Sequence, residues 1–241
     1  MKLGGSVITD KSNPFSFRSD VTSALAEEIV SSDEKAVVVH GGGSYGHTVA
    51  KQYGLSSTTG SPGPGVSETR MAMLELDQLV CKTMRDYRMK PYPFSPFDLF
   101  TKAGSSAAAN WLRNLLKADL TPITFGDVVQ VGSSFKVLSG DDIAYELARV
   151  LRPERVVFAL NVDGVYEPNT KVIIPELTPS KVRKVKVETG DDATGGMGRK
   201  LQVASKIASM GVRVSFVSGY RRNEFAKALK GLDFYGTMVK S

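Results

Sequence analysis

Four glycine-containing segments combine a flexible backbone with lysine, histidine, serine or aspartate side chains. They lie at residues 2–6, 40–47, 139–142 and 193–200. Glycines let backbone N–H groups approach an anion closely, above all where a helix begins, and lysine ammonium groups neutralise phosphate charge. Each segment alone can also be a structural turn that requires glycine. Together, the four segments favour a site for phosphate chemistry.

The segment at 40–47 shows the most specific pattern. Three valines at 37–39 predict a short buried strand, the glycines at 41–43 follow as a turn, and helical spacing continues through 44–53. A strand, a glycine turn and a helix N-terminus are typical of phosphate sites. His47 adds a titratable hydrogen-bonding group, although it can also cap or pack the helix. His40 ends the strand, and we expect it to be a structural hydrogen bonder.

Several familiar chemistries are disfavoured by the sequence. It has no G-x-x-x-x-G-K-[ST] loop, no G-x-G-x-x-G fingerprint and no protein-kinase motif set. With two histidines and one cysteine, no metal-ligand cluster is expected. Ser44 and His47 lack the G-x-S-x-G elbow of a hydrolase. Cys81 lies among apolar neighbours, which favours a core position over a nucleophile.

The elements that must position these segments alternate along the chain. Alternating strands and helices predict parallel βαβ units, with a central sheet covered by helices on both faces. The segment 55–66 is rich in Ser, Thr, Gly and Pro, so no regular element is expected there. The apolar residues before Gly4 are unusually few for a buried strand, which is consistent with a natural N-terminus longer than this sequence. Strands are expected at 36–39, 122–124, 128–131, 135–138, 156–160, 212–217 and 237–239, and helices at 21–29, 44–53, 68–87, 110–117, 143–151, 201–210 and 224–230.

Composition limits the class of protein. A chain of 241 residues, 41% hydrophobic, can bury one large α/β core or two joined lobes. A net charge of +6 without long basic runs does not indicate a nucleic-acid binder. A single cysteine indicates a reducing compartment, and no apolar run approaches the roughly 18 residues of a membrane span. We therefore expect a cytoplasmic protein without nucleic-acid or membrane partners.

Five motifs follow one another in order over nearly the whole chain. They are Lys2-x-Gly4-Gly5-Ser6, His40-Gly41-Gly42-Gly43, Ser139-Gly140-Asp141-Asp142, Val162-Asp163-Gly164-Val165-Tyr166 and Gly195-Gly196-Met197-x-x-Lys200. This ordered set resembles the amino-acid kinase superfamily. Within it, Thr9-Asp10-Lys11, the run 41–47 and the run 192–197 most resemble the archaeal-type isopentenyl phosphate kinases. Those enzymes transfer the γ-phosphoryl group of ATP to isopentenyl phosphate, giving isopentenyl diphosphate for isoprenoid biosynthesis.

The resemblance implies an architecture and a set of partners. It implies one amino-acid-kinase domain over 1–241, an αβα sandwich with a mainly parallel sheet and two lobes. The lobe at about 1–153 would bind the acceptor, and the lobe at about 154–241 would bind the nucleotide. ATP and Mg²⁺ are the implied cofactors, a small phosphate compound is the implied substrate, and a homodimer is the implied assembly.

The resemblance also implies roles for individual side chains. ATP and a phosphate monoester bring roughly six negative charges together, so several cations must converge. By resemblance, Lys2 lies between the two phosphates, Lys11 assists, and Lys200 holds the β/γ end of ATP. Asp141 would orient the lysines, and His47 would bind the acceptor phosphate. Further acceptor contacts are expected from Gly41, Gly42, Gly43, Gly46 and Ser139, and further nucleotide contacts from Gly4, Gly5, Ser6, Asp163, Gly164, Tyr166, Gly195 and Gly196.

Other interpretations stay open at the level of sequence. Lys11 can be an ordinary loop lysine, Lys200 an exposed helix lysine, and Asp163 a residue that shapes its turn or approaches nucleotide or Mg²⁺. Fosfomycin kinases share the histidine, so a phosphonate acceptor is the second candidate, and a non-catalytic nucleotide- or anion-binding protein is the third. Apolar residues that can wall an isopentenyl tail, or simply form core, are Met71, Met73, Leu74, Phe94, Phe97 and Phe100.

Overall fold

The computed structural model of the chain describes residues 1–55, 63–96, 104–168, 170–183 and 196–241. Every strand and helix expected from the sequence has a counterpart there, with ends shifted by a few residues. The strands are Lys2–Leu3 (β1), Val38–His40 (β2), Pro91–Pro93 (β3), Thr121–Phe125 (β4), Asp127–Val131 (β5), Ser134–Leu138 (β6), Arg155–Leu160 (β7), Glu176–Leu177 (β8), Arg213–Ser218 (β9) and Gly236–Val239 (β10).

The helices are distributed along the whole chain between these strands. They are Gly5–Ile8 (α1), Ser19–Ser32 (α2), Gly43–Gln52 (α3), Gly63–Asp86 (α4), Gly104–Lys117 (α5), Gly140–Leu151 (α6), Pro179–Val182 (α7), Gly196–Ala208 (α8) and Glu224–Lys230 (α9). None of the helices in the described ranges is long and apolar enough to cross a lipid bilayer.

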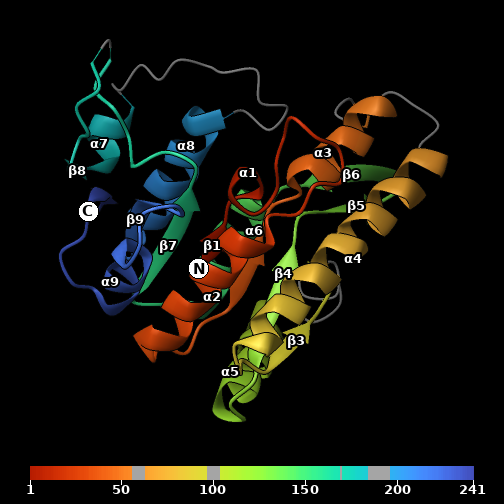
Figure 1. Cartoon of the computed structure of the whole chain (residues 1–241), viewed down its shortest axis with the longest axis horizontal. Helices are drawn as coiled ribbons and strands as arrows, with labels where there is room; N and C mark the ends of the chain where they lie inside the picture. Colours follow the sequence, from red (N-terminus) through yellow and green to blue (C-terminus); the bar gives the residue numbers. More distant parts are fainter. Residues whose placement is uncertain (56–62, 97–103, 169, 184–195) are drawn as a thin grey trace.

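An eight-stranded sheet forms the centre of the molecule, in the order β3-β4-β2-β1-β7-β9-β10-β8 (Figure 1). The short strand β1 lies in its middle and pairs in parallel with β2 and β7. The β9–β10 pair is antiparallel, whereas the other neighbouring pairs of this sheet are parallel. A separate antiparallel hairpin, β5–β6, lies beside α4 (Figure 1). The expected sandwich with a mainly parallel sheet is therefore confirmed.

Alternation along the strands divides the core into two layers. In β7, Val157 and Ala159 pack on one face of the sheet with residues of α2, α4 and α9. Their neighbours Val156, Phe158 and Leu160 pack on the other face with residues of α6 and α8. Because side chains alternate across a strand, this pattern places helices on both faces.

The glycine turns after β1 and β2 lie at the same end of the strands because β1 is parallel to both of its neighbours. The backbone N–H of Gly4 donates to Ala159 O at 3.0 Å, and that of Gly41 donates to Leu3 O at 3.0 Å. The carboxyl ends of β2, β1 and β7 therefore lie side by side. Ligands of parallel α/β sheets bind beyond such strand ends.

One local prediction needs correction, and a segment for which no element was predicted forms a strand. Residues 63–66 were expected to be irregular, but they form the first turn of α4, while 56–62 lie outside the described residues. Pro64 is compatible with this helix because the first turn has no internal partner for a backbone N–H. The proline-rich segment after α4 contains the unexpected strand β3. It lies at the edge of the sheet, where proline is tolerated because one side of the strand has no partner.

Candidate active site

A cavity that is open to solvent lies beyond the carboxyl ends of the central strands. It collects residues from both ends of the chain, as the sequence predicted. Of the site residues expected from sequence, it is lined by Lys2, Gly4, Gly5, Ser6, Lys11, Gly41, Gly42, Gly46, His47, Ser139, Asp141 and Lys200. Gly140 of the glycine segment 139–142 and the tail-pocket candidate Met73 also line it. The lining residues that had no role in the sequence-based prediction are Thr69, Gly126, Asp127, Val137, Leu138, Leu160 and Asn161.

The first two glycine turns pack directly against each other. A Cβ atom on Gly5 would lie 2.3 Å from the backbone nitrogen of Gly43. Gly43 itself has φ +49°, and a Cβ there would lie 1.9 Å from Thr9 Oγ1. Any side chain at either position would therefore force the turns apart. The structure places Gly43 in this contact, outside the cavity lining.

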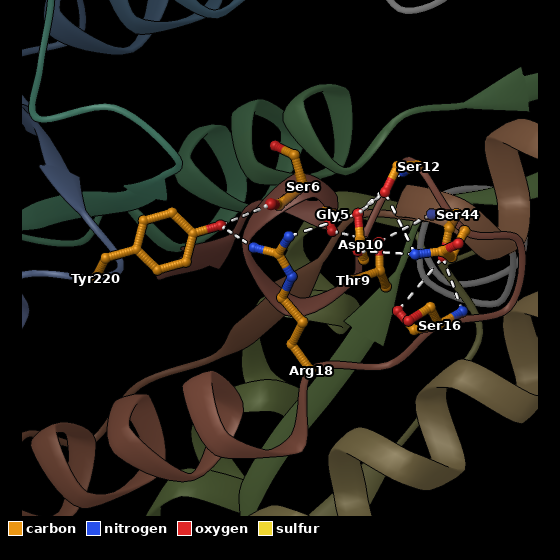
Figure 2. Close-up of polar contacts among 10 residues, drawn as sticks. Gly5, Ser6, Thr9, Asp10, Ser12, Ser16, Arg18, Ser44 and Tyr220 are labelled. Atoms are coloured by element: carbon orange, nitrogen blue, oxygen red, sulfur yellow. Dashed lines mark hydrogen bonds and ion pairs between the residues drawn. The ribbon is translucent and has the colours of Figure 1, made fainter.

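Thr9 fastens the two turns together, as Figure 2 shows. Its hydroxyl donates to Gly5 O at 2.7 Å and accepts from the backbone N–H of Ser44 at 2.9 Å. The Ser44 hydroxyl in turn accepts from the backbone N–H of Ser16 at 3.2 Å. Since Thr9 is fully buried, its own two hydrogen bonds are shielded from water and hold the two turns together.

A buried carboxylate holds two lysines at the cavity. Lys2 Nζ lies 2.8 Å from Asp141 Oδ1, and Lys200 Nζ lies 3.2 Å from Asp141 Oδ2. The side chains of Lys2 and Asp141 are 5% and 4% exposed. Burial acts to raise the pKa of Asp141, but the two ammonium groups outweigh it and hold that pKa at about 2. One anion thus orients two cations, and the cluster carries net positive charge.

The N-terminus of α6 presents this carboxylate. Ser139 caps the helix, because its hydroxyl accepts from Asp142 N at 3.1 Å and donates to Asp142 Oδ2 at 2.7 Å. Asp141 lies in the first turn, where the helix dipole stabilises an anion. Ser139 was expected to contact the substrate. It lines the cavity, but its hydroxyl makes the hydrogen bonds that cap α6.

A second ion pair, which sequence analysis did not identify, docks α8 on α6. Arg199 Nη2 lies 2.7 Å from Asp142 Oδ1 and 2.8 Å from Oδ2. Arg199 and Lys200 are adjacent in α8, and Asp142 and Asp141 are adjacent in α6. The two neighbouring pairs therefore fix the start of α8 next to the carboxylate cluster.

His47 and Lys11 face the same cavity from the N-terminal half. His47 lies on α3, one residue after Gly46, and Lys11 lies in the loop between α1 and α2. Met73 of α4 enters beside them, because a Cβ on Gly46 would lie 2.5 Å from Met73 Sδ. The glycines of α3 thus make room for an apolar side chain at the cavity wall.

Among the candidates for an apolar tail pocket, Met73 alone lines the cavity within the described part of the chain. Met71 is 62% exposed, and Phe94 packs on Trp111 with ring centroids 5.1 Å apart. Leu74 packs against the main core. The other two candidates, Phe97 and Phe100, lie outside the described residues.

The structural interpretations of His40 and Cys81 are confirmed. His40 is fully buried, with Nε2 3.2 Å from Asp77 Oδ1 and Nδ1 3.2 Å from Gly41 O. Cys81 Sγ lies 3.9 Å from Asp77 Oδ2. Burial, reinforced by that carboxylate, raises the pKa of the Cys81 thiol to about 12. The thiol therefore stays protonated and is not a nucleophile at neutral pH.

In the turn after β7, Asn161 lines the cavity, whereas residues 162–166 lie outside its lining. Arg221 holds both oxygens of Asp163, with Nε–Oδ1 at 2.7 Å and Nη2–Oδ2 at 3.1 Å. This hydrogen bonding lowers the pKa of Asp163. Gly164 permits close packing, because a Cβ there would lie 2.8 Å from Thr237 Oγ1.

The remaining residues expected at the nucleotide have different positions. Tyr166 is 37% exposed. Gly196 begins α8 with φ +53°, a conformation that favours glycine. Gly195 lies outside the described residues. Within the described ranges, His, Cys, Asp and Glu side chains form no cluster of three that could hold a metal ion.

Comparison with known protein families identifies the family of this chain. The sequence pattern of the amino acid kinase family matches residues 1–218. The chain belongs to this family. The resemblance drawn from the glycine motifs is thereby confirmed.

Relatives of this amino acid kinase include several named isopentenyl phosphate kinases. The protein of Thermoplasma acidophilum is 31% identical over 87% of this chain and 86% of its own length. The isopentenyl phosphate kinase of Methanocaldococcus jannaschii is 30% identical over 96% of this chain and 94% of its own length. A crystal structure of the T. acidophilum isopentenyl phosphate kinase product complex superposes with a TM-score of 0.82, at 28% identity, covering 99% of this chain and 98% of that one.

Proposed function

We propose that the protein transfers the γ-phosphoryl group of ATP to isopentenyl phosphate, giving isopentenyl diphosphate and ADP. The observation that carries the proposal is the buried Lys2–Asp141–Lys200 cluster at a cavity that His47 also lines. The likeness to isopentenyl phosphate kinases over almost the full chain supports the choice of acceptor. Met73 at the cavity wall offers apolar surface for the acceptor's tail.

The reaction needs positioning and charge neutralisation more than acid–base chemistry. An anionic oxygen of the acceptor phosphate attacks the γ-phosphorus, and the bond from that phosphorus to the β–γ bridging oxygen breaks. Lys2 neutralises charge between the two phosphates, and Lys200 neutralises charge on the leaving β-phosphate. Asp141 does not act as a base, because both of its oxygens are paired and its pKa is about 2. The acceptor is already anionic, so no proton has to be removed.

Magnesium fits this site through the nucleotide. Mg²⁺ is commonly bound by substrate phosphates together with few carboxylates. Asp141 is held by two lysines and Asp163 by Arg221, so neither is an open ligand. We therefore infer that Mg²⁺ enters on the phosphates of ATP, where it adds neutralising charge.

We assign the acceptor to the lobe at about 1–153 and the nucleotide to the lobe at about 154–241, within one domain. Lys11 and His47 come from the first part and Lys200 from the second, which supports this division. Continuous pairing of β1 with β7 joins the two parts through one sheet. We also expect a homodimer in the cytoplasm; light scattering after gel filtration tests the assembly.

Phosphorus NMR of a reaction with ATP, Mg²⁺ and isopentenyl phosphate tests the proposed reaction. We expect the acceptor's monophosphate resonance to be replaced by two coupled diphosphate resonances as ADP forms. ATP consumption that yields inorganic phosphate alone would refute phosphoryl transfer to the acceptor.

Replacing Lys200 with alanine should weaken the use of ATP. Loss of a cation from the β/γ end of the nucleotide is expected to raise the KM for ATP and lower kcat, together by about 100-fold in kcat/KM. The KM for the acceptor should change little. Steady-state kinetics checks this prediction, with Lys230→Ala, a change at an exposed residue of α9, as the control. Unchanged kinetic parameters for ATP in Lys200→Ala would contradict the role of Lys200.

A further inference from the structure

We propose that Arg18 and Tyr220 are positioning residues that hold the loop carrying Lys11 over the cavity. Arg18 directly precedes α2, and Tyr220 follows β9 near the other end of the chain. The inference rests on the proposed function, in which Lys11 assists phosphoryl transfer. Neither residue lines the cavity, so both act through other groups.

A chain of polar contacts joins the two halves of the molecule at this point (Figure 2). The Tyr220 hydroxyl donates to the backbone oxygen of Ser6 at 3.1 Å. Arg18 Nη1 donates to the same hydroxyl at 2.7 Å, and its Nη2 lies 3.5 Å from Asp10 Oδ1. Tyr220 thus connects the glycine turn after β1 to Arg18, and Arg18 connects Tyr220 to the residue before Lys11.

Asp10 connects Arg18 to the loop that carries Lys11 through hydrogen bonds from Ser12 and Asn13. Its carboxylate accepts from Ser12 N at 3.0 Å, from Ser12 Oγ at 2.7 Å and from Asn13 Nδ2 at 3.1 Å. The hydrogen bonds from Ser12 lower the pKa of Asp10, so it is ionised at neutral pH. Lys11 lies between Asp10 and Ser12. The orientation of the Asp10 carboxylate therefore sets the backbone from which Lys11 reaches the cavity.

The geometry of Arg18 suits this role. Its guanidinium is planar and offers several donors in fixed directions, so it can face a hydroxyl and a carboxylate at once. The contacts are partly exposed, and such pairs contribute little to global stability. Their removal should consequently change the position of the loop more than the folding of the protein.

A matched control lies beside Tyr220. Arg222 Nη2 lies 3.0 Å from Glu27 Oε2, which also links the segment after β9 to α2. Both side chains of this pair are exposed, and neither contacts the loop of Lys11. Arg222→Gln therefore removes a surface link between the same segments without touching the proposed chain.

The kinetic test compares Arg18→Met, Tyr220→Phe and Arg222→Gln. We expect kcat to fall about fivefold to tenfold in the first two, as for loss of one hydrogen bond, with an unchanged KM for ATP. Arg222→Gln should match wild type. In a Lys11→Met background, Arg18→Met should cost nothing further, because it acts through Lys11. A full multiplicative loss in the double variant would overturn the proposal.

Hydrogen exchange of the backbone amides of residues 10–13 supplies a readout that does not need turnover. Exchange should be faster in Arg18→Met and Tyr220→Phe than in wild type or Arg222→Gln; equal exchange would overturn the proposal. If wild type fails to phosphorylate isopentenyl phosphate, the proposed function fails, while the exchange result still decides whether the chain holds the loop. Tyr220→Phe removes a single hydroxyl, so it carries the test even if Arg18→Met folds poorly.

Discussion

Replacing Asp141 with asparagine is expected to lower kcat by about 100-fold or more, because Lys2 and Lys200 lose the anion that orients them. The amide has no negative charge, so two ammonium groups remain close together at a largely buried site. Removing one partner of a buried ion pair typically costs about 3–5 kcal/mol of stability. The variant should therefore unfold at a lower temperature and turn over slowly even when folded.

Glu146→Gln is the matched control for this prediction. It neutralises another carboxylate of α6, whose partner Arg149 lies at the surface at 2.8 Å and away from the cluster. We expect it to retain most activity and stability. Rates measured per folded molecule, with folding monitored by circular dichroism, separate the two effects. Comparable activity of the two variants would contradict the role of the Lys2–Asp141–Lys200 cluster.

The acid stability of the protein provides a second readout of Asp141. Its pKa is lowered from 3.8 to about 2, so the folded state favours the ionised form. The resulting stabilisation is fully present above about pH 4 and is lost as the pH falls towards 2. Asp141→Asn should flatten this part of the stability curve in urea titrations between pH 2 and 5. An unchanged slope would contradict the assignment.

Replacing His47 with alanine should lower kcat with a phosphate acceptor by about 10²- to 10³-fold, the cost of losing one donor to a reacting oxyanion. ATP binding should persist, because Lys200 and the rest of the proposed nucleotide lobe are unchanged. Calorimetric titration with ATP and steady-state kinetics with the acceptor check the two halves of this prediction. Lys51→Ala, an exposed change on the same helix, should match wild type. A near-normal rate in His47→Ala would remove the proposed role.

The meeting of the glycine turns after β1 and β2 could be predicted from sequence because it depends on a general property of the sheet. Neighbouring parallel strands have their carboxyl ends on the same side, so the turns that follow β1 and β2 must lie close together. A strong local pattern, three valines and His40 followed by three glycines, predicted the end of β2. The proline-rich sequence of the edge strand β3 has no clear strand pattern, so this strand was not predicted. Its pairing with β4 decides its structure.

The polar contacts between residues far apart in the sequence could not be predicted in the same way. Arg199 meets Asp142 across 57 residues, Arg221 meets Asp163 across 58, and Arg18 meets Tyr220 across 202. No local periodicity relates such residues, because their contact depends on how the whole sheet is assembled.

The apolar wall of the cavity was only partly recognisable, for a geometric reason. Thr69 and Met73 are four residues apart on α4 and face the cavity together. Met71 lies between them in sequence but points elsewhere on the helix, since two residues correspond to about half a turn. Helical spacing from a known cavity residue would have selected Met73 over Met71, but sequence alone did not identify that first residue.

The specificity constant for competing acceptors tests the central claim most directly. Wild-type protein with Mg-ATP should be assayed for ADP formation with isopentenyl phosphate, fosfomycin, carbamate, UMP and N-acetylglutamate. We predict the highest kcat/KM for isopentenyl phosphate, because His47 and the lysines meet its phosphate while Met73 meets its tail. Turnover of only carbamate, UMP or N-acetylglutamate would contradict the assignment of this cavity to a phosphate acceptor with an apolar tail.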